Sequence, residues 1–340
     1  MRSLVVFASL LMAAVAPAFA GNFSNLYFFG DSLTDTGNVT EVYATLPRAP
    51  GAPAVIPGPP YDAEGRASNG LLYADVLAAG LGLNATASSR GGGNYAFGGA
   101  RTRYQLFGAP YLGVLDQVAQ FEALPGPADP AALYVVWAGS NNVQDILTGK
   151  TVDALGKPVP GVAGTLADIG SLLTGLYAEG ARNLLVPNVP NLVRVPRLNS
   201  LSAAAQAQAS GLINAFNSNL DGMLDQLQAS HAGMNIIRFN SYNAFEDLVA
   251  NAAAQGFSNI TGRCYTGDDL GFTGGGTVCA NPDSYLFWDG IHPTAAAHRI
   301  LGLEMLAAAV PEPASWAMLG LGLLLLGQRR RAKRLVERGH

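Results

Sequence analysis

The chain has few of the cysteine and histidine side chains that bind zinc. Its 340 residues include only two cysteines and four histidines. Cys264 and Cys279 have no other cysteine or histidine nearby at the spacing that zinc sites use. A zinc site is therefore less favoured than a disulfide between these two cysteines.

Charged side chains are also scarce, at 13% of the residues. The formal net charge is −4. Arg2 contributes one positive charge and residues 311–340 contribute four net positive charges, so the chain between the two ends carries about −9. Nucleic-acid binding needs a basic face, so this composition argues against a nucleic-acid partner. The hydrophobic fraction of 49% makes a sizeable core feasible.

The first 20 residues have the pattern of a secretory signal peptide. Arg2 precedes an apolar run over residues 4–15, and Ala18, Phe19 and Ala20 form a small-residue cleavage site. We place the cleavage after Ala20 and assign residues 1–20 to the signal. The alternative, a short buried helix, fits this pattern poorly at the start of a chain.

Residues 311–340 have the pattern of a sorting tail. Pro311, Glu312 and Pro313 precede an apolar run over residues 314–327, and a basic cluster follows at 329–334. The run of about 14 residues is shorter than the roughly 17–25 that span a bilayer. The tail resembles the Pro-Glu-Pro (PEP-CTERM) sorting signal of exported proteins in Gram-negative bacteria. This resemblance implies transient membrane attachment, cleavage by a sorting peptidase, and a final place in the cell envelope, on the cell surface or outside the cell. The alternative is an ordinary membrane anchor with its basic cluster in the cytoplasm.

Export makes a disulfide between Cys264 and Cys279 the first expectation, because secreted proteins meet an oxidising compartment. Closing a loop of this size would contribute roughly 3 kcal/mol to stability. The loop leads directly into the segment that carries Asp289, so the bond would steady that segment.

Two short motifs far apart in the chain together make a nucleophilic site. Gly30, Asp31, Ser32 and Leu33 follow an apolar run that is typical of a buried strand, and Asp289 to Pro293 read Asp-Gly-Ile-His-Pro. A serine is a poor nucleophile unless a base takes its proton and a third group orients that base. His292 and Asp289 supply these two groups three residues apart. Each motif alone is common and is usually structural. Their order in the chain and the strand-like run beside each of them favour a catalytic role.

Strand-like and helix-like segments alternate along the chain. Strands are expected at residues 26–29, 133–137, 184–186 and 234–239, and helices at 166–179, at 203–229 and from Pro293 to Leu306. Such alternation predicts an α/β fold in which a parallel sheet carries helices on both faces. Ser32 and Asn141 each follow a strand, so we expect both at the carboxyl edge of the sheet, where open α/β sheets bind ligands.

Four blocks of sequence, taken in order, resemble the GDSL/SGNH hydrolase family over most of residues 22–310. They are Phe-Gly-Asp-Ser-Leu-Thr-Asp-Thr-Gly-Asn at 29–38, Asn-Tyr-Ala-Phe-Gly-Gly-Ala at 94–100, Val-Trp-Ala-Gly-Ser-Asn-Asn at 136–142 and Phe-Trp-Asp-Gly-Ile-His-Pro-Thr at 287–294. Gly-Arg-Ala-Ser-Asn-Gly at 65–70 is also similar to family members. The resemblance implies a hydrolase domain over residues 21–310, with a flavodoxin-like three-layer sandwich around a central parallel sheet.

The resemblance also implies a role for each site residue. Ser32 is the nucleophile, and Asp289 and His292 complete the triad. The oxyanion hole takes the backbone N–H of Ser32, a glycine N–H that we place at Gly99 with Gly98 as the alternative, and the side-chain amide of Asn141. Family members often have Asp after that Asn, and Asn142 stands there instead, which puts the rigidity of the loop in question more than the activity.

We therefore expect an exported serine ester hydrolase, a GDSL esterase or lipase, that works through an acyl-enzyme and requires no metal or cofactor. Its substrate would be a lipid, short-chain or carbohydrate ester. One alternative is an envelope or matrix binding protein that keeps the fold without turnover, as the sorting tail suggests. Another is deacetylation or acyl transfer on a polysaccharide by the same residues. Residues 46–60 either shape the substrate entrance or form a surface loop without contact to the site.

Overall fold

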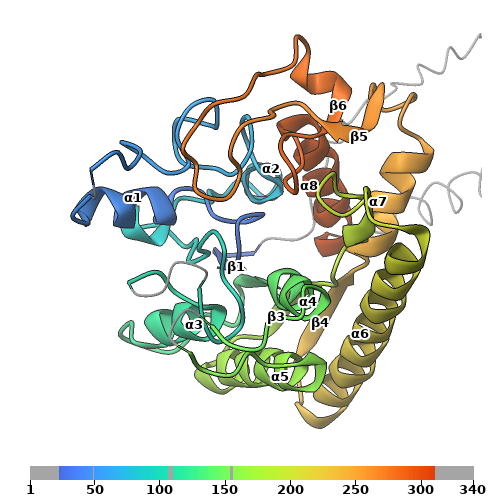
Figure 1. The fold of residues 1–340 in the computed structure, drawn as a ribbon. Coiled ribbons are helices and arrows are strands. Elements are labelled where there is room, and N and C mark those ends of the chain that lie inside the picture. The colour runs from blue at the N-terminus through green and yellow to red at the C-terminus, as the bar shows by residue number, and fades with distance from the viewer. Residues whose placement is uncertain (1–22, 49, 106–109, 154–155, 311–340) are drawn as a thin grey trace, which may run out of the picture. The chain divides into compact units, whose positions relative to one another are not determined.

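The central sheet has four parallel strands in the order of the chain (Figure 1). The computed structural model describes residues 23–310 except 49, 106–109 and 154–155. The sheet belongs to one compact unit, from Phe23 to Ala309. Its strands are β1 (Leu26–Gly30), β2 (Leu133–Trp137), β3 (Asn183–Pro187) and β4 (Asn235–Phe239). The parallel register pairs Phe29 with Val136 and Leu185 with Ile237, so the carboxyl ends of all four strands meet at one edge.

Burial follows from the position of each strand in the sheet. Every residue of β2 is buried, because helices cover both faces of this inner strand and its side chains are all apolar. In β4 the exposure varies from residue to residue, as expected for a strand at an edge. The apolar runs of the sequence are therefore the inner strands of a doubly covered sheet.

A fifth extended segment extends the sheet on the other side of β1. The N–H of Phe28 donates to the carbonyl of Gly93 at 3.0 Å, and Phe28 accepts from the N–H of Tyr95 at 2.8 Å. The N–H of Phe97 donates to Gly30 at 3.2 Å. With this segment included, β1 lies between strands that are reached by crossovers in opposite directions, which is the flavodoxin-like order. The carboxyl end of β1 is thus the topological switch point of the sheet.

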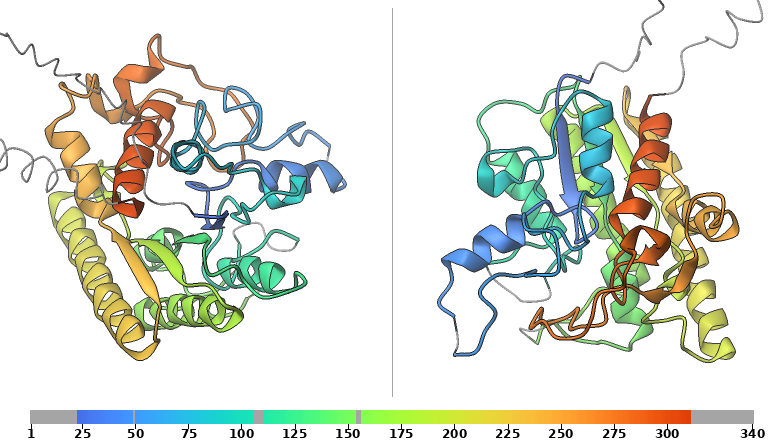
Figure 2. Two further views of the ribbon diagram at one scale, coloured as in Figure 1. Left: turned by 180° about the vertical axis from the view of Figure 1, so that it is seen from behind. Right: turned by 90° about the horizontal axis from the view of Figure 1, so that it is seen from above.

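Successive residues of β1 point to opposite faces and pack against different helices. Phe28 contacts Tyr73 with ring centroids 6.3 Å apart, whereas Phe29 contacts Phe121 at 5.8 Å on the other face. Tyr73 belongs to α2 (Tyr73–Gly80), which packs against α8 (Ala295–Ala309). Phe121 belongs to α3 (Val114–Glu122), which lies beside α5 (Val162–Glu179), followed by α6 (Ala203–Ser230) (Figure 2). The sheet therefore lies between two helical layers, and the predicted three-layer α/β fold is confirmed.

The remaining elements lie around the sheet or near its carboxyl edge. They are α1 (Asn38–Thr45), α4 (Ser140–Leu147), α7 (Ser241–Ala250), the parallel pair β5 (Asn259–Arg263) and β6 (Tyr285–Phe287), and the single 3-10 turns η1 (Ser88–Arg90), η2 (Leu192–Arg194) and η3 (Pro282–Ser284).

The strands and long helices fall close to their expected positions, with one correction. Pro293 was expected to open the last helix, but α8 begins at Ala295. The hydroxyl of Thr294 accepts the N–H of Ala297 at 3.4 Å, so Thr294 occupies the capping position. The extended segment at 93–97 and strand β5 were not expected, because their sequences lack a continuous apolar run. β6 is the strand-like run beside the Asp289 motif.

The two ends that were interpreted as signal peptide and sorting tail lie outside the described residues. Within residues 23–310, leaving aside 49, 106–109 and 154–155, no helix is both long and apolar enough to cross a bilayer.

Candidate active site

Three loops at the carboxyl edge of the sheet, and a fourth segment from the end of the chain, bring the expected catalytic and oxyanion residues together. Ser32 follows β1 by two residues, and Gly99 follows the extended segment that flanks β1. Asn141 lies in the first turn of α4, directly after β2. These loops leave three adjacent strands at the switch point, where diverging crossovers leave a crevice. Asp289 and His292 come from the segment between β6 and α8.

Ser32, His292 and Asp289 form a continuous line of hydrogen bonds. The Oγ atom of Ser32 lies 2.8 Å from Nε2 of His292, and Nδ1 of His292 lies 2.7 Å from Oδ2 of Asp289. Asp289 is fully buried, and His292 is 7% exposed. An ionised Asp289 can only accept a hydrogen bond, so the neutral imidazole of His292 carries its proton on Nδ1. Nε2 is then free to accept the proton of Ser32. This arrangement fits nucleophilic activation of Ser32.

The carboxylate of Asp289 is held from both sides. Its Oδ1 accepts the N–H groups of Ile291 at 2.8 Å and His292 at 2.7 Å, and its Oδ2 also accepts the hydroxyl of Tyr61 at 2.8 Å. Burial alone would raise the pKa of Asp289, but the attraction of His292 and the hydrogen bonds to the carboxylate hold the pKa below its usual value. Asp289 is therefore ionised at neutral pH despite its burial.

The two glycines proposed for the oxyanion hole differ in the use of their N–H groups. The N–H of Gly98 donates to Oδ2 of Asp35 at 2.8 Å. The N–H of Gly99 has no hydrogen-bond acceptor among the described residues, and Gly99 has a φ of 78°, a conformation that favours glycine. Both glycines line the cavity beside Ser32. Of the two, Gly99 is thus the glycine whose N–H is open to a ligand.

The amide of Asn141 is oriented by two acceptors. Its Nδ2 donates to the carbonyl of Ala100 at 3.0 Å and to Oδ2 of Asp31 at 3.2 Å. Burial raises the pKa of Asp31 to about 6, although the N–H of Leu33 and the nearby His292 oppose this shift. Asp31 directly precedes the nucleophile in the first motif, but no role was predicted for it, because its contact with Asn141 joins two distant motifs.

Asn142 supports the same loop without the carboxylate that family members often have. It is buried, its Oδ1 accepts the N–H of Thr102 at 3.1 Å, and its Nδ2 donates to the hydroxyl of Thr102 at 3.2 Å. Two hydrogen bonds to one residue restrain the start of α4. An amide can donate as well as accept, so Asn142 satisfies a hydroxyl and an N–H together.

A cavity of about 160 Å³ opens beside Ser32 and His292. The two arginines that line it are paired: Arg101 with Asp145 at 2.8 Å, and Arg197 with Asp269 at 3.1 Å. The larger part of its wall is apolar and comes from several loops and from α1, η2 and α7. It consists mainly of Leu33, Val39, Pro57, Pro190, Leu192, Val195, Phe245, Leu270, Phe272 and Ile291. This wall suits an uncharged, apolar portion of a ligand. Since Pro57 belongs to it, residues 46–60 do contact the site.

The segment between the two cysteines reaches the edge of the site. Cys264 and Cys279 are joined by a disulfide. Within the loop that the disulfide closes, Oδ2 of Asp269 accepts the N–H of Gly290 at 2.7 Å. Gly290 lies between Asp289 and Ile291, so the disulfide loop directly contacts the segment that bears the acid and the base.

Two further features concern the residues that the structure describes. No group of three His, Cys, Asp or Glu side chains among them is arranged to hold a metal ion. His298 is buried in α8, and its Nδ1 accepts the N–H of Tyr73 at 3.3 Å. Burial lowers the pKa of His298 to about 3, so it stays neutral and its role is structural.

Comparisons with known proteins place the chain beside one family of hydrolases by sequence. The family model described as GDSL-like lipase/acylhydrolase matches residues 26–305, and the PEP-CTERM protein-sorting motif matches residues 309–331. Acetylajmalan esterase 2 of Rauvolfia serpentina is 29% identical to the chain, with 82% of this chain and 88% of that protein covered. A GDSL esterase/lipase of Arabidopsis thaliana is 28% identical, with 81% and 84% covered. Among solved structures, LAE5, an alpha/beta hydrolase enzyme from the metagenome of Lake Arreo, is 15% identical, has a TM-score of 0.45 and covers 84% of this chain and 94% of its own.

Proposed function

Since the chain belongs to the GDSL-like lipase/acylhydrolase family and is an ester hydrolase, we propose that it cleaves carboxylic esters through a covalent acyl-enzyme on Ser32. The observation that carries this proposal is the aligned pair of hydrogen bonds from Ser32 to His292 and from His292 to Asp289, at 2.8 and 2.7 Å. The serine and the other two residues come from distant parts of the chain, and local turn formation would not bring them together.

In the proposed reaction, Ser32 Oγ attacks the ester carbonyl while Nε2 of His292 takes its proton. The imidazolium then gives this proton to the leaving alcohol oxygen, and the acyl group stays on Ser32. Water, activated in turn by His292, attacks the acyl-enzyme and releases the acid. Asp289 stays ionised and stabilises the imidazolium throughout.

The negative charge that develops on the carbonyl oxygen would be held by three donors. They are the N–H groups of Ser32 and Gly99 and the amide of Asn141. We favour Gly99 over Gly98 because the Gly98 N–H already binds Asp35. The amide of Asn141 would exchange its longer hydrogen bond, to Asp31 at 3.2 Å, for the oxyanion. Donors that are oriented before the reaction lower the barrier, and each is worth roughly 3–4 kcal/mol.

We propose an uncharged ester with an apolar group as the substrate. The apolar wall of the cavity and the internal pairing of Arg101 and Arg197 support this choice, since each arginine already has a carboxylate partner. A negatively charged ester would lose hydration in the cavity without gaining a partner charge.

The PEP-CTERM motif indicates export and surface sorting in Gram-negative bacteria. We propose that residues 1–20 are a signal peptide, that residues 21–310 form the hydrolase domain, and that a sorting peptidase removes the tail from about residue 311. The product would remain in the envelope, on the cell surface or outside the cell.

The test combines labelling with turnover. A fluorophosphonate probe and p-nitrophenyl esters of graded chain length are applied to the chain over residues 21–310 and to its Ser32→Ala variant, after circular dichroism has shown that both fold. We expect labelling and hydrolysis by the parent and neither by the variant. A folded parent that is neither labelled nor active on any ester would favour the binding-protein alternative.

A further inference from the structure

Tyr61 is not one of the three triad residues, but it forms a hydrogen bond to one of them. Its hydroxyl donates to Oδ2 of Asp289 at 2.8 Å, across 228 positions in the chain. The same oxygen accepts Nδ1–H of His292 at 2.7 Å. Tyr61 is 6% exposed, so the hydrogen bond is shielded from water. Burial and the neighbouring charge of Asp289 raise the pKa of Tyr61 above its usual value, which keeps the hydroxyl protonated as a donor.

The ring of Tyr61 is fixed by three aromatic neighbours. It meets Tyr265, Phe272 and Trp288 edge to face, with centroid distances of 5.4, 5.3 and 6.1 Å. Tyr61, Cys264, Tyr265 and Trp288 form a buried cluster around the start of the disulfide loop, and Phe272 packs against it. Edge-to-face packing from several directions leaves the ring few rotamers, so the hydroxyl has a defined position relative to Asp289.

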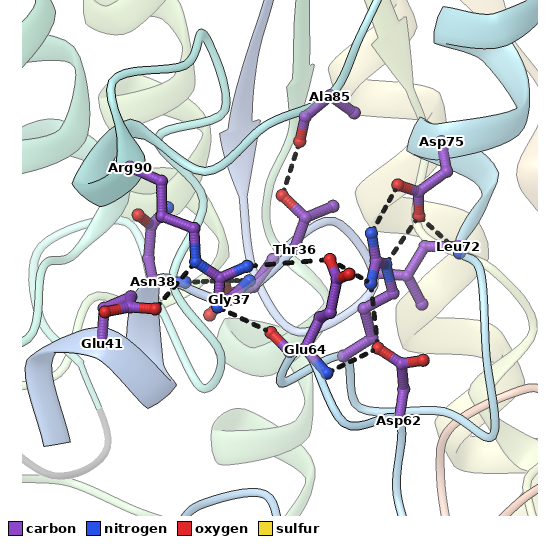
Figure 3. Close-up of polar contacts among 12 residues, drawn as sticks. Thr36, Gly37, Asn38, Glu41, Asp62, Glu64, Leu72, Asp75, Ala85 and Arg90 are labelled. Carbon is purple, nitrogen blue, oxygen red and sulfur yellow. Dashed lines mark hydrogen bonds and ion pairs between the residues drawn. The ribbon is translucent and has the colours of Figure 1, made fainter. Parts of the chain in front are cut away.

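The backbone that follows Tyr61 is anchored by Arg66, which lies in the Gly-Arg-Ala-Ser-Asn-Gly stretch. Nε and Nη2 of Arg66 bind both carboxylate oxygens of Asp75 in α2 at 2.9 Å, and Nη1 binds Oδ1 of Asp62 at 2.9 Å. Figure 3 shows Asp62, Glu64 and Asp75 converging in this network. A bidentate pair with a buried guanidinium is a rigid connection, so the residue next to Tyr61 is tied to the helical layer.

The same stretch also contacts the backbone that follows His292. The hydroxyl of Ser68 donates to the carbonyl of Pro293 at 2.8 Å, and Oδ1 of Asn69 accepts the N–H of Ala295 at 2.8 Å. Residues 61–69 therefore bind the Asp289 to Ala295 segment at three points, one of them the carboxylate itself.

We infer that Tyr61 is a positioning residue of the active site, which acts through Asp289 to hold its carboxylate toward His292. This inference rests on the proposed function. The hydrogen bond from the Tyr61 hydroxyl keeps Oδ2 of Asp289 directed at Nδ1 of His292. The contacts of residues 62–69 fix the position of Tyr61 relative to the segment that carries His292. Without the hydroxyl, Oδ2 keeps only the imidazole as its side-chain partner, and the alignment of His292 with Ser32 loosens.

The decisive variant is Tyr61→Phe, which removes the hydroxyl and keeps the ring. Tyr265→Phe is its matched control, because it removes a hydroxyl from the same cluster with no hydrogen bond to Asp289. We expect Tyr61→Phe to lower kcat about tenfold or more with KM unchanged, the scale of one hydrogen bond to a charged group. Tyr265→Phe should stay within about twofold of the parent. Melting temperatures show whether each variant keeps the fold.

A double-mutant cycle with Asp289→Asn separates positioning from general packing. If Tyr61 acts through the carboxylate, Tyr61→Phe costs less than about twofold in the Asp289→Asn background. An equal loss in both backgrounds, or a Tyr61→Phe variant as active as the parent, would overturn the inference and leave the proposed function in place. If the parent itself hydrolyses no ester, the proposed function fails instead.

Discussion

Ser32 and His292 lie 260 positions apart in the chain, and their side chains meet at 2.8 Å. The contact depends on two independent placements. β1 delivers Ser32 to the switch point of the sheet, and the segment before α8 folds back across the same edge with His292. The acid has a fixed position relative to the base, because the Asp289 carboxylate accepts the backbone N–H of His292 at 2.7 Å and so closes a tight turn. The site is therefore the junction of one strand end and one preorganised turn.

Replacement of the acid should abolish most turnover without unfolding the protein. In Asp289→Asn the amide cannot stabilise the imidazolium and favours the wrong tautomer, so we expect kcat to fall by roughly 10⁴. The measurement is steady-state hydrolysis of a p-nitrophenyl ester. Asp283→Asn, on the exposed η3 turn of the neighbouring segment, serves as the control and should retain activity. Activity above about a tenth of the parent would contradict the role of Asp289.

Loss of the amide at Asn141 tests the oxyanion hole. Asn141→Ala removes a donor that acts mainly in the transition state, so kcat should fall by roughly 10²–10³ while KM changes little. Asn219→Ala on α6 is the control, since that amide bonds within its own helix at Ala215. A rise in KM with unchanged kcat would indicate that Asn141 binds the ground state instead.

Asp31 should make stability depend on pH in the acidic range. Its pKa is about 6 in the folded protein and 3.8 in a model compound. Between these values the folded protein holds a proton that the unfolded chain has lost. The free energy of unfolding therefore falls as pH rises from about 4 to about 6, by up to roughly 3 kcal/mol, and this effect is constant at higher pH. Urea unfolding of the parent and of Asp31→Asn at several pH values measures the difference. A parent that gains stability over Asp31→Asn as pH rises would contradict the sign.

The disulfide should contribute to both stability and turnover. The double variant Cys264→Ser with Cys279→Ser should lose roughly 3 kcal/mol of stability, because the unfolded chain regains the freedom of a loop whose ends are 15 positions apart. Turnover should fall as well, since Asp269 in this loop holds the N–H of Gly290 beside the acid. Unfolding of the oxidised parent and of the parent in reductant gives the matched comparison. Equal midpoints would show that the bond does not stabilise the fold.

Two glycines test the packing of the helical layers. A Cβ on Gly302 in α8 would lie 2.6 Å from Cβ of Val76 and 2.8 Å from the carbonyl of Tyr73, whereas a Cβ on Gly222 in α6 would meet nothing within 4 Å. We expect Gly302→Ala to destabilise the protein by roughly 1–3 kcal/mol through overpacking. Gly222→Ala should stabilise it by about 0.5–1 kcal/mol through helix propensity. The melting temperatures of both variants test these expectations. A Gly302→Ala variant more stable than the parent would show that α2 and α8 separate easily.

Local patterns were enough to predict the layers of this protein and the residues of its candidate site. The run from Leu26 to Gly30 and the five apolar residues of β2 are strands because each is apolar on both faces, which is a property of the segment itself. Ser32 and His292 were predicted from short motifs, since each chemical role needs one residue type beside a turn or a strand end, whereas the role of Asn141 was implied by the family resemblance.

Other features depend on contacts between segments that no local pattern encodes. The role of Tyr61 depends on a hydroxyl that meets Asp289 across 228 positions, and a tyrosine in an irregular loop carries no mark of that contact. The difference between Gly98 and Gly99 depends on Asp35, which takes the Gly98 N–H. The extended segment beside β1 forms because β1 offers it backbone partners, although its own sequence is weakly strand-like. Hydrogen bonds between residues far apart in the sequence form only when the topology brings donor and acceptor together. Only the tertiary structure therefore shows which of them exist.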